Sequence, residues 1–342
     1  MFILPHHILF LFILLFSMTM VACSNSWFSM WLGLEMNMLS FVTLLMTSVN
    51  MREAESGIKY FLVQVLGSIG FLFGSLSLGC SGFFFSFNEF LWTYLIFFSL
   101  LLKIGVGPFH FWFPGVMEGI NMINCGMLMT WQKLGPFCIL IDLQNSIMKS
   151  VLVVFAMISG LVGGLGGLNQ TSLRKLLAYS SIGHLGWMLG AIFISNTIWK
   201  TYFLTYSFLS LSLILILFFM GFTHINQVFS FGWEKTTDSL MIMMMFLSLG
   251  GLPPFGGFLM KWVVFNGLVN NGLFLLSTIL ISSSLLNLFY YLRVCYSLSL
   301  MGSDAPLWVS MNTSTNISIW VVLSGVISII ILFSSSFILM LM

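Results

Sequence analysis

The chain is a succession of long apolar stretches separated by short polar segments. A helix needs about 20 mostly apolar residues to cross a hydrocarbon core roughly 30 Å thick. In these stretches Phe, Leu, Met and Ile follow one another without alternation, which predicts helices and disfavours a transmembrane barrel. Eleven spans are predicted, at residues 3–22, 27–48, 58–80, 89–111, 122–142, 150–168, 174–195, 199–222, 239–266, 272–297 and 318–341.

Two of the predicted spans, the fourth and the ninth, contain an interruption. The ninth is long enough to hold a break between two half-helices. The two are five spans apart, and because five is odd, a five-helix unit that occurs twice would be inverted in the membrane. The predicted fold is therefore an all-α polytopic membrane protein, a single transmembrane domain over 1–342. Its predicted parts are a first inverted half (1–143, spans one to five), a second inverted half (144–297, spans six to ten) and a loop with the final span (298–342).

Composition excludes several functional classes. Of 342 residues, 59% are hydrophobic and 6% are charged, and the mean hydropathy is +1.08, which excludes a soluble cytosolic enzyme. Eleven basic against nine acidic residues leave too little charge for a nucleic-acid surface. The five cysteines lie far apart without a C-x-x-C pair, and the five histidines lack a spacing suited to haem. We therefore expect no metal site and no redox cofactor in this chain.

Basic residues outside the spans predict the orientation. Six lie on the N-terminal side and two on the opposite side: Arg52, Lys59, Arg174, Lys175, Lys235 and Arg293 against Lys149 and Lys200. The positive-inside rule then places the N-terminus in the cytoplasm or matrix, and an odd number of spans places the C-terminus on the other side. No basic segment precedes the first apolar run, so we expect insertion where the chain is made.

Three lysines lie inside apolar stretches, each next to glycine or proline: Lys103, Lys133 and Lys261. A lysine at membrane depth costs at least ~2.5–3.5 kcal/mol on insertion scales, so each should face the interior of the helix bundle. One interpretation is proton exchange; the other is that each lysine satisfies carbonyls freed by an adjacent break. The predicted breaks lie at Gly105, Gly107 and Pro108, at Gly135 and Pro136, and at Pro253 and Pro254.

Glu35 is the one carboxylate well inside a predicted span, and Lys103 in the same half is its leading partner. His184 lies near the middle of the seventh span. It is either a hydrogen-bonded core residue or a group that passes protons near neutral pH. For Glu118, a loop charge and a residue at a water-filled entrance remain equal alternatives.

The combined motifs closely resemble the subunit 2 family of mitochondrial NADH:ubiquinone oxidoreductase, respiratory complex I, in an arthropod-like form. The resemblance covers almost the whole chain, and its motifs are Leu-Gly-Leu-Glu35-Met-Asn, Lys103-x-Gly-x-Gly-Pro-Phe-His110-Phe-Trp112-Phe-Pro114, Trp131-Gln132-Lys133, Gly167-Leu-Asn-Gln-Thr-Ser-Leu-Arg174-Lys175 and Leu-Gly-Gly251-Leu-Pro253-Pro254-Phe255. Taken together these motifs are highly specific, whereas the Pro-Pro-Phe and buried-lysine elements alone would fit any antiporter-like subunit of the complex.

The resemblance implies an antiporter-like, proton-translocating subunit in the membrane arm of the complex, with no redox site of its own. Glu35 and Lys103 would form the charge pair of the first half-channel, Lys133 would connect, and His184 would lead to Lys261 in the second half. FMN, iron-sulfur clusters and ubiquinone would belong to other subunits. The implied partners are subunits 4 and 4L, accessory subunits and membrane lipid, without nucleic acid.

By the same resemblance the chain would lie in the mitochondrial inner membrane, with its N-terminus in the matrix and its C-terminus in the intermembrane space. Two rival functions remain open on the residues alone. A stand-alone cation/proton antiporter would share the buried lysines and breaks but would be active without partners. A structural scaffold would explain the size, but it gives no reason for buried lysines and a buried glutamate.

Overall fold

The computed structural model describes residues 5–46, 50–84, 89–143, 146–231, 236–253 and 255–299, and these are organised as helices. An isolated antiparallel bridge joins Ser172 and His224. Contacts divide the chain into two compact units, Met1–Leu152 and Val153–Met342. The all-helical fold class is confirmed. The eleventh predicted span (318–341) and the predicted break residue Pro254 lie outside the described residues.

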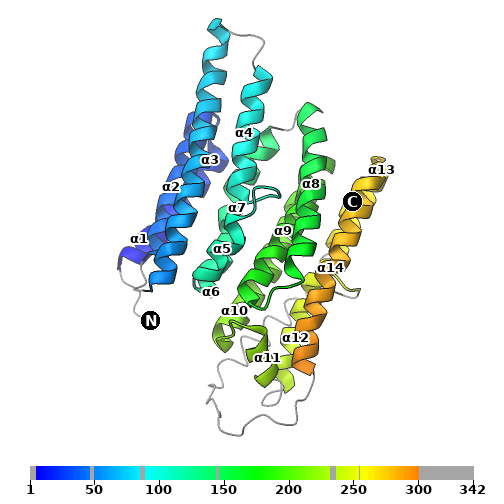
Figure 1. The fold of residues 1–342 in the computed structure, drawn as a ribbon. Coiled ribbons are helices and arrows are strands. Elements are labelled where there is room, and N and C mark those ends of the chain that lie inside the picture. The colour runs from blue at the N-terminus through cyan, green and yellow to red at the C-terminus, as the bar shows by residue number, and fades with distance from the viewer. Residues whose placement is uncertain are drawn as a thin grey trace. The chain divides into compact units, whose positions relative to one another are not determined.

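The first unit is built from two long helical hairpins followed by short helices (Figure 1). α1 packs along α2, α3 packs along α4, and α7 contacts α1, α2 and α4. The helices are α1 (Pro5–Cys23), α2 (Trp27–Leu45), α3 (Met51–Phe84), α4 (Glu89–Ile104), α5 (Trp112–Gly119), α6 (Met122–Met129) and α7 (Trp131–Asp142). Ser26 begins α2 as its N-cap and accepts a hydrogen bond from the Ser29 backbone N–H at 3.3 Å.

The second unit contains the remaining helices, and α8 begins within the last residues of the first. Here α9 packs against α10, α13 and α14, and α12 packs against α10, α13 and α14. The helices are α8 (Ser146–Gly167), α9 (Leu173–Ile194), α10 (Asn196–Met220), α11 (Ile225–Phe231), α12 (Thr236–Gly250), α13 (Gly256–Asn270) and α14 (Phe274–Ser299).

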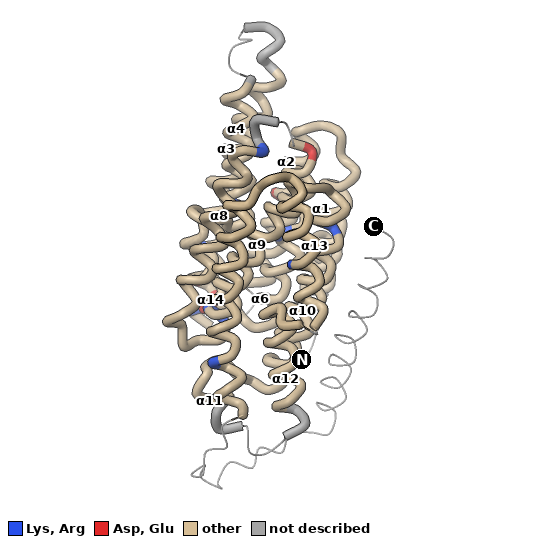
Figure 2. Tube along the Cα trace, turned by 90° about the vertical axis from the view of Figure 1, so that its right-hand side faces the viewer, with Lys and Arg blue, Asp and Glu red and all other residues tan. Residues whose placement is uncertain are grey.

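Six of the described helices are individually long and apolar enough to cross a membrane, at Trp27–Leu45, Met51–Gly79, Lys149–Gly167, Leu173–Ile194, Asn196–Met220 and Phe274–Ser299. Of the other predicted spans, 3–22 corresponds to the shorter helix α1 and 89–111 begins with α4, while 122–142 and 239–266 are each divided between two short helices, so the count of eleven stays a prediction. Acidic and basic positions are few along the chain trace (Figure 2). The chain is therefore a multi-pass membrane protein, and its rare buried charges are the natural place to look for function.

α3 shows how these helices are adapted to lipid. Its buried face carries polar and small residues, including Ser56, Tyr60, Gln64 and Ser68. Its exposed face is apolar over most of its length. This is the reverse of a helix on a soluble protein, because the surrounding solvent is hydrocarbon and the polar groups must find partners inside the bundle.

Candidate functional site in the buried polar axis of each unit

Lys103 lies in the last turn of α4, directly before the first break. Its side chain is only 6% exposed. The aliphatic part of the Lys103 side chain packs against α3 at Gly67. A side chain at Gly67 would compete for this space, because a Cβ there would lie 2.8 Å from Lys103 Cγ. Gln64, one turn away on the same face of α3, donates a hydrogen bond to the Lys103 carbonyl at 3.2 Å. α3 therefore provides both the space for the lysine and a partner for its backbone.

Glu35 lies in the middle of α2, with a partly buried side chain. Its Oε1 atom is shielded from solvent and has no hydrogen-bond partner among the described residues. The carboxylate interacts electrostatically with Lys103 and with the Tyr60 hydroxyl of α3. Within the described part of the chain, no direct ion pair joins Glu35 to Lys103. The two groups of the predicted charge pair thus act on each other through space without touching.

An amide pair ties α2 to α7 beside these charges. Asn37 Nδ2 donates to Gln132 Oε1 at 3.0 Å, and Gln132 Nε2 donates back to Asn37 Oδ1 at 3.2 Å. Tyr60 adds a third bond to Gln132 Oε1 at 3.2 Å. Asn37 and Gln132 lie in the sequence motifs but were not among the predicted site residues. Their position next to Glu35 and Lys133 in apolar spans was the signal that could have identified them.

Lys133 lies in α7 and is 2% exposed. Its Nζ lies 4.9 Å from the centroid of the Phe113 ring, a cation–π contact with α5. The predicted break at Gly135 and Pro136 is corrected by the structure, because both residues lie inside α7. The interruption comes earlier, at Thr130 between α6 and α7. The carbonyl that Pro136 leaves without its helical N–H partner belongs to residue i−4, Gln132, in the first turn of α7, so the proline lies close to the start of this helix and α7 continues through it.

The first break follows α4 and contains the predicted residues Gly105, Gly107 and Pro108. Gly105 has φ +79°. The N–H of Gly105 bonds the Leu101 and Leu102 carbonyls at 3.0 and 3.2 Å, and the N–H of Val106 bonds the Leu101 carbonyl at 3.2 Å. This is a Schellman ending with glycine in the left-handed position, and it satisfies carbonyls that the helix terminus would otherwise leave bare.

The second break follows α12 and repeats the same turn. Gly251 has φ +78°, and its N–H bonds the carbonyls of Leu247 and Ser248 at 3.0 and 3.1 Å. The N–H of Leu252 bonds Leu247 at 3.3 Å. Pro253 lies within this break, before α13 begins at Gly256.

Lys261, in the second turn of α13, reaches back across the second break. Its Nζ donates to the Gly250 carbonyl at 2.8 Å, and the lysine is 7% exposed. Gly250 is the last residue of α12, where the helix dipole presents partial negative charge to a cation. Gly251 also has to lack a side chain here, because a Cβ would lie 2.9 Å from Lys261 Nζ.

His184 lies in the middle of α9 and is 6% exposed. Its Nδ1 is hydrogen-bonded to the Tyr202 hydroxyl at 2.9 Å, and the Tyr206 ring lies 5.0 Å away, centroid to centroid. These buried tyrosines were not among the site residues predicted from the sequence. Their signal was weak, because a tyrosine in an apolar helix also marks membrane interfaces.

The predicted site residues are thus distributed over both units. Glu35, Lys103 and Lys133 lie on α2, α4 and α7 of the first unit, while His184 and Lys261 lie on α9 and α13 of the second. In each unit the helices concerned pack against one another, α7 on α2 and α4, and α13 on α9. Each unit therefore holds ionisable groups away from lipid on packed, interrupted helices.

Comparison with known proteins assigns the family. The family model described as the NADH:quinone oxidoreductase/Mrp antiporter transmembrane family matches residues 24–287. NADH-ubiquinone oxidoreductase chain 2 of Anopheles gambiae is 42% identical over 90% of this chain and 90% of its own length. The Aedes aegypti protein of the same name is 43% identical over 92% of each chain.

Solved structures share the fold at low sequence identity. A chain of respiratory complex I from Thermus thermophilus superposes with a TM-score of 0.84 at 24% identity, covering 96% of this chain and 78% of that chain. A chain of the Mrp complex from Dietzia sp. gives a TM-score of 0.80 at 15% identity, covering 94% and 74%. The antiporter-like fold and the family resemblance are both confirmed, and the chain belongs to the NADH:quinone oxidoreductase/Mrp antiporter family, among the NADH-ubiquinone oxidoreductase chain 2 proteins.

Proposed function

We propose that this chain is an antiporter-like, proton-translocating subunit in the membrane arm of respiratory complex I, and that Glu35, Lys103, Lys133, His184 and Lys261 carry the protons. The observation that carries this proposal is the burial of three lysines in apolar helices, at 6%, 2% and 7% exposure. Charged residues at this depth are costly, and in membrane helices they commonly mark proton or ion pathways.

The mechanism begins at Glu35. A carboxylate near Lys103 stabilises the protonated form of that lysine, because two opposite charges attract strongly in a medium of low dielectric constant. When charge rearrangement elsewhere in the complex weakens this interaction, Lys103 releases its proton toward Lys133. The proton then passes by way of His184 to Lys261. His184 suits the intermediate step since imidazole both accepts and donates a proton near neutral pH.

The energy for this displacement comes from outside the chain. NADH oxidation and ubiquinone reduction would take place at FMN, iron-sulfur clusters and a quinone site in other subunits. We propose subunits 4 and 4L, accessory subunits and lipid as the neighbours. The proposed location is the mitochondrial inner membrane, with the N-terminus in the matrix and the C-terminus in the intermembrane space.

The test replaces Lys103 or Lys261 by Met, which has similar length and no charge, in the assembled complex. We expect fewer protons translocated per NADH oxidised, or slower coupled turnover, with assembly preserved. Lys200→Met is the matched control, because Lys200 is exposed at the start of α10 and should leave both quantities unchanged. Normal stoichiometry and turnover in both buried-lysine variants would instead support a scaffold.

A second experiment separates this function from a stand-alone antiporter. Mildly solubilised membranes are run on a native gel and stained for NADH-dependent dye reduction, and the chain is located by mass spectrometry. We expect it in the large NADH-oxidising band. Its presence only in a small band without that activity would contradict the proposal.

A further inference from the structure

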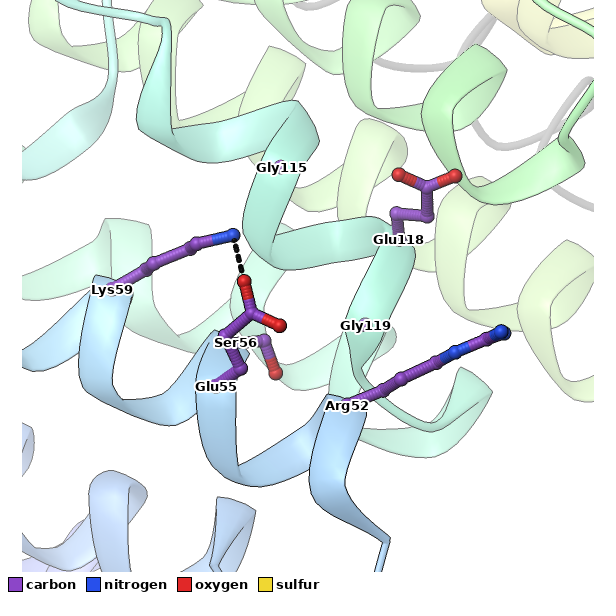
Figure 3. A pocket seen from close by; sticks show the side chains of 7 residues that line it. All are labelled: Arg52, Glu55, Ser56, Lys59, Gly115, Glu118 and Gly119. Atoms are coloured by element: carbon purple, nitrogen blue, oxygen red, sulfur yellow. Dashed lines mark ion pairs between the residues drawn. The ribbon is translucent and has the colours of Figure 1, made fainter.

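α3 begins with charged residues that border a cavity of about 380 Å³. Arg52, Glu55, Ser56 and Lys59 of α3 face Gly115, Glu118 and Gly119 of α5 (Figure 3). We call this the α3–α5 notch. Glu55 and Lys59 form an ion pair at 2.6 Å, while Arg52 extends past Gly119 and the Glu118 carboxylate points away from that ion pair.

A stripe of exposed apolar side chains begins next to the notch and continues along α3. Ile58, Leu62, Leu66, Ile69, Phe73 and Leu76 follow one another at intervals of three or four residues, and each is between 50% and 64% exposed. These intervals place all of them on one face of α3, in line with Glu55 and Lys59. The described side chains after Lys59 on this helix include no charged residue.

The dimensions of this face match a bilayer. From Ile58 to Leu78 the helix extends for about 30 Å at 1.5 Å per residue, the thickness of the hydrocarbon core. The notch therefore falls at the level of lipid head groups. An amphipathic ligand with its polar end in the notch would lay its chains along the stripe.

The charges of the notch select among head groups. Two cations and two carboxylates sum to zero, which complements a zwitterion better than an anionic head group. Arg52 offers a planar guanidinium for a phosphate, and Glu118 offers an exposed carboxylate for an ammonium. The lining contains no aromatic ring of the kind that holds a quaternary ammonium. A primary ammonium, which can donate hydrogen bonds to a carboxylate, fits these groups better.

From this arrangement we propose that the α3–α5 notch binds a phospholipid with a phosphoethanolamine head group, with its phosphate at Arg52 and its ammonium at Glu118. The acyl chains lie along the exposed stripe of α3. This site is separate from the buried lysines. It gives Glu118, which lies in α5, a role that differs from both a loop charge and a residue at a water-filled entrance, that of a lipid ligand at the membrane surface.

The test uses the assembled complex in its native membrane and two photoactivatable probes with identical acyl chains, phosphatidylethanolamine and phosphatidylglycerol. Labelled peptides are mapped by mass spectrometry. We expect the stripe residues of α3 to be labelled several-fold more by phosphatidylethanolamine. The apolar side chains Leu285 and Phe289 are exposed on α14, and this face should label equally with both probes.

Variants then locate the head group. Glu118→Gln should lower phosphatidylethanolamine labelling of α3 by about threefold to fivefold, the size of one exposed ion pair. Gly115→Leu should do the same by filling the notch, since a Cβ at Gly115 meets nothing within 4 Å. Asp142→Asn, an exposed carboxylate at the end of α7, is the matched control.

Three results would overturn the proposal. Equal labelling of α3 by the two probes in the wild-type complex would remove the head-group selectivity, and this comparison needs no variant. Unchanged labelling in both Glu118→Gln and Gly115→Leu would place the lipid elsewhere. Crosslinks from the stripe to another subunit, without lipid labelling, would show that protein covers this face.

Discussion

The two interrupted helices, α4–α5 and α12–α13, contain the same turn but hold their lysines on opposite sides of it. Both first halves end in a Schellman motif, with Gly105 and Gly251 at nearly equal φ values of +79° and +78°. Lys103 comes before its turn and Lys261 after its own. The turn is therefore a reusable backbone element, and the charge is placed independently of it.

The two lysines also interact with different groups. Lys103 lies in the field of Glu35, a carboxylate on another helix. Lys261 donates to the Gly250 carbonyl within its own broken helix. The sequence is consistent with this difference, because no acidic residue occurs between Asp142 and Glu234 or between Asp238 and Asp304. A side-chain partner can change its charge, whereas a backbone carbonyl cannot, so in the proposed relay Lys103 would respond to Glu35 and Lys261 would receive the proton.

The strongest test of the comparison is Gly257→Ala. A Cβ at Gly257, in α13, would overlap the carbonyl oxygen of Ser248, in α12. Because backbone cannot move aside cheaply, we expect destabilisation of about 3 kcal/mol or more and loss of the chain from the assembled complex. Native gels measure this directly. Gly190→Ala is the control, since its Cβ would meet side chains only at 3.6 Å. Normal assembly of Gly257→Ala would show that the close approach is not needed.

Next in size is the contrast between Gly251→Ala and Gly105→Ala. Each places alanine in the left-handed region at a cost of about 1–2 kcal/mol. At Gly251 the methyl group would also displace Lys261 Nζ, whereas at Gly105 the nearest atom is in the Trp112 ring, at 3.3 Å. We expect both variants to lower thermal stability and only Gly251→Ala to lower proton stoichiometry as well. Equal stoichiometry in the two would mean that the Lys261–Gly250 contact is dispensable.

A smaller effect distinguishes the partners of the two lysines. Glu35→Gln removes the carboxylate charge with little change in shape. Combined with Lys103→Met in a double-mutant cycle on coupled turnover, it should show a coupling energy of about 1 kcal/mol. The same cycle with Lys261→Met should be additive to within about 0.5 kcal/mol. Strong coupling of Glu35 to Lys261, with none to Lys103, would reverse our assignment of the responsive lysine.

The sequence predicted most of the fold because hydrocarbon imposes one rule on every span, that backbone groups must bond within the helix. From this rule the apolar helices could be located, and helix breaks could be expected near Lys103 and Lys261. The rule could not place the break near Lys133, where the discontinuity is at Thr130 and Pro136 lies inside α7. The residue at which the helix is interrupted depends on how the neighbouring turn accommodates the proline, and residue types alone do not specify that residue.

The candidate site was predicted less completely. The charged members stood out because a lysine or glutamate in an apolar helix is rare and costly. The neutral partners did not, since Tyr60, Gln132 and Tyr202 acquire their roles only when helices distant in sequence pack together. Which hydroxyl or amide lies next to which charged group depends on how the helices pack. The hydrophobic periodicity of the sequence does not specify these neighbours.

The smallest expected effect concerns one of these neutral partners and sharpens the contrast between the units. Tyr202→Phe removes the hydroxyl bonded to His184 Nδ1 and keeps the ring. Loss of one buried hydrogen bond of about 1 kcal/mol should slow coupled turnover by roughly fivefold at most, with the complex still assembled. Tyr296→Phe, on an exposed tyrosine of α14, is the control. Turnover unchanged in Tyr202→Phe would make the hydroxyl a packing group, and the second unit would then depend on His184 and Lys261 without help from its tyrosines.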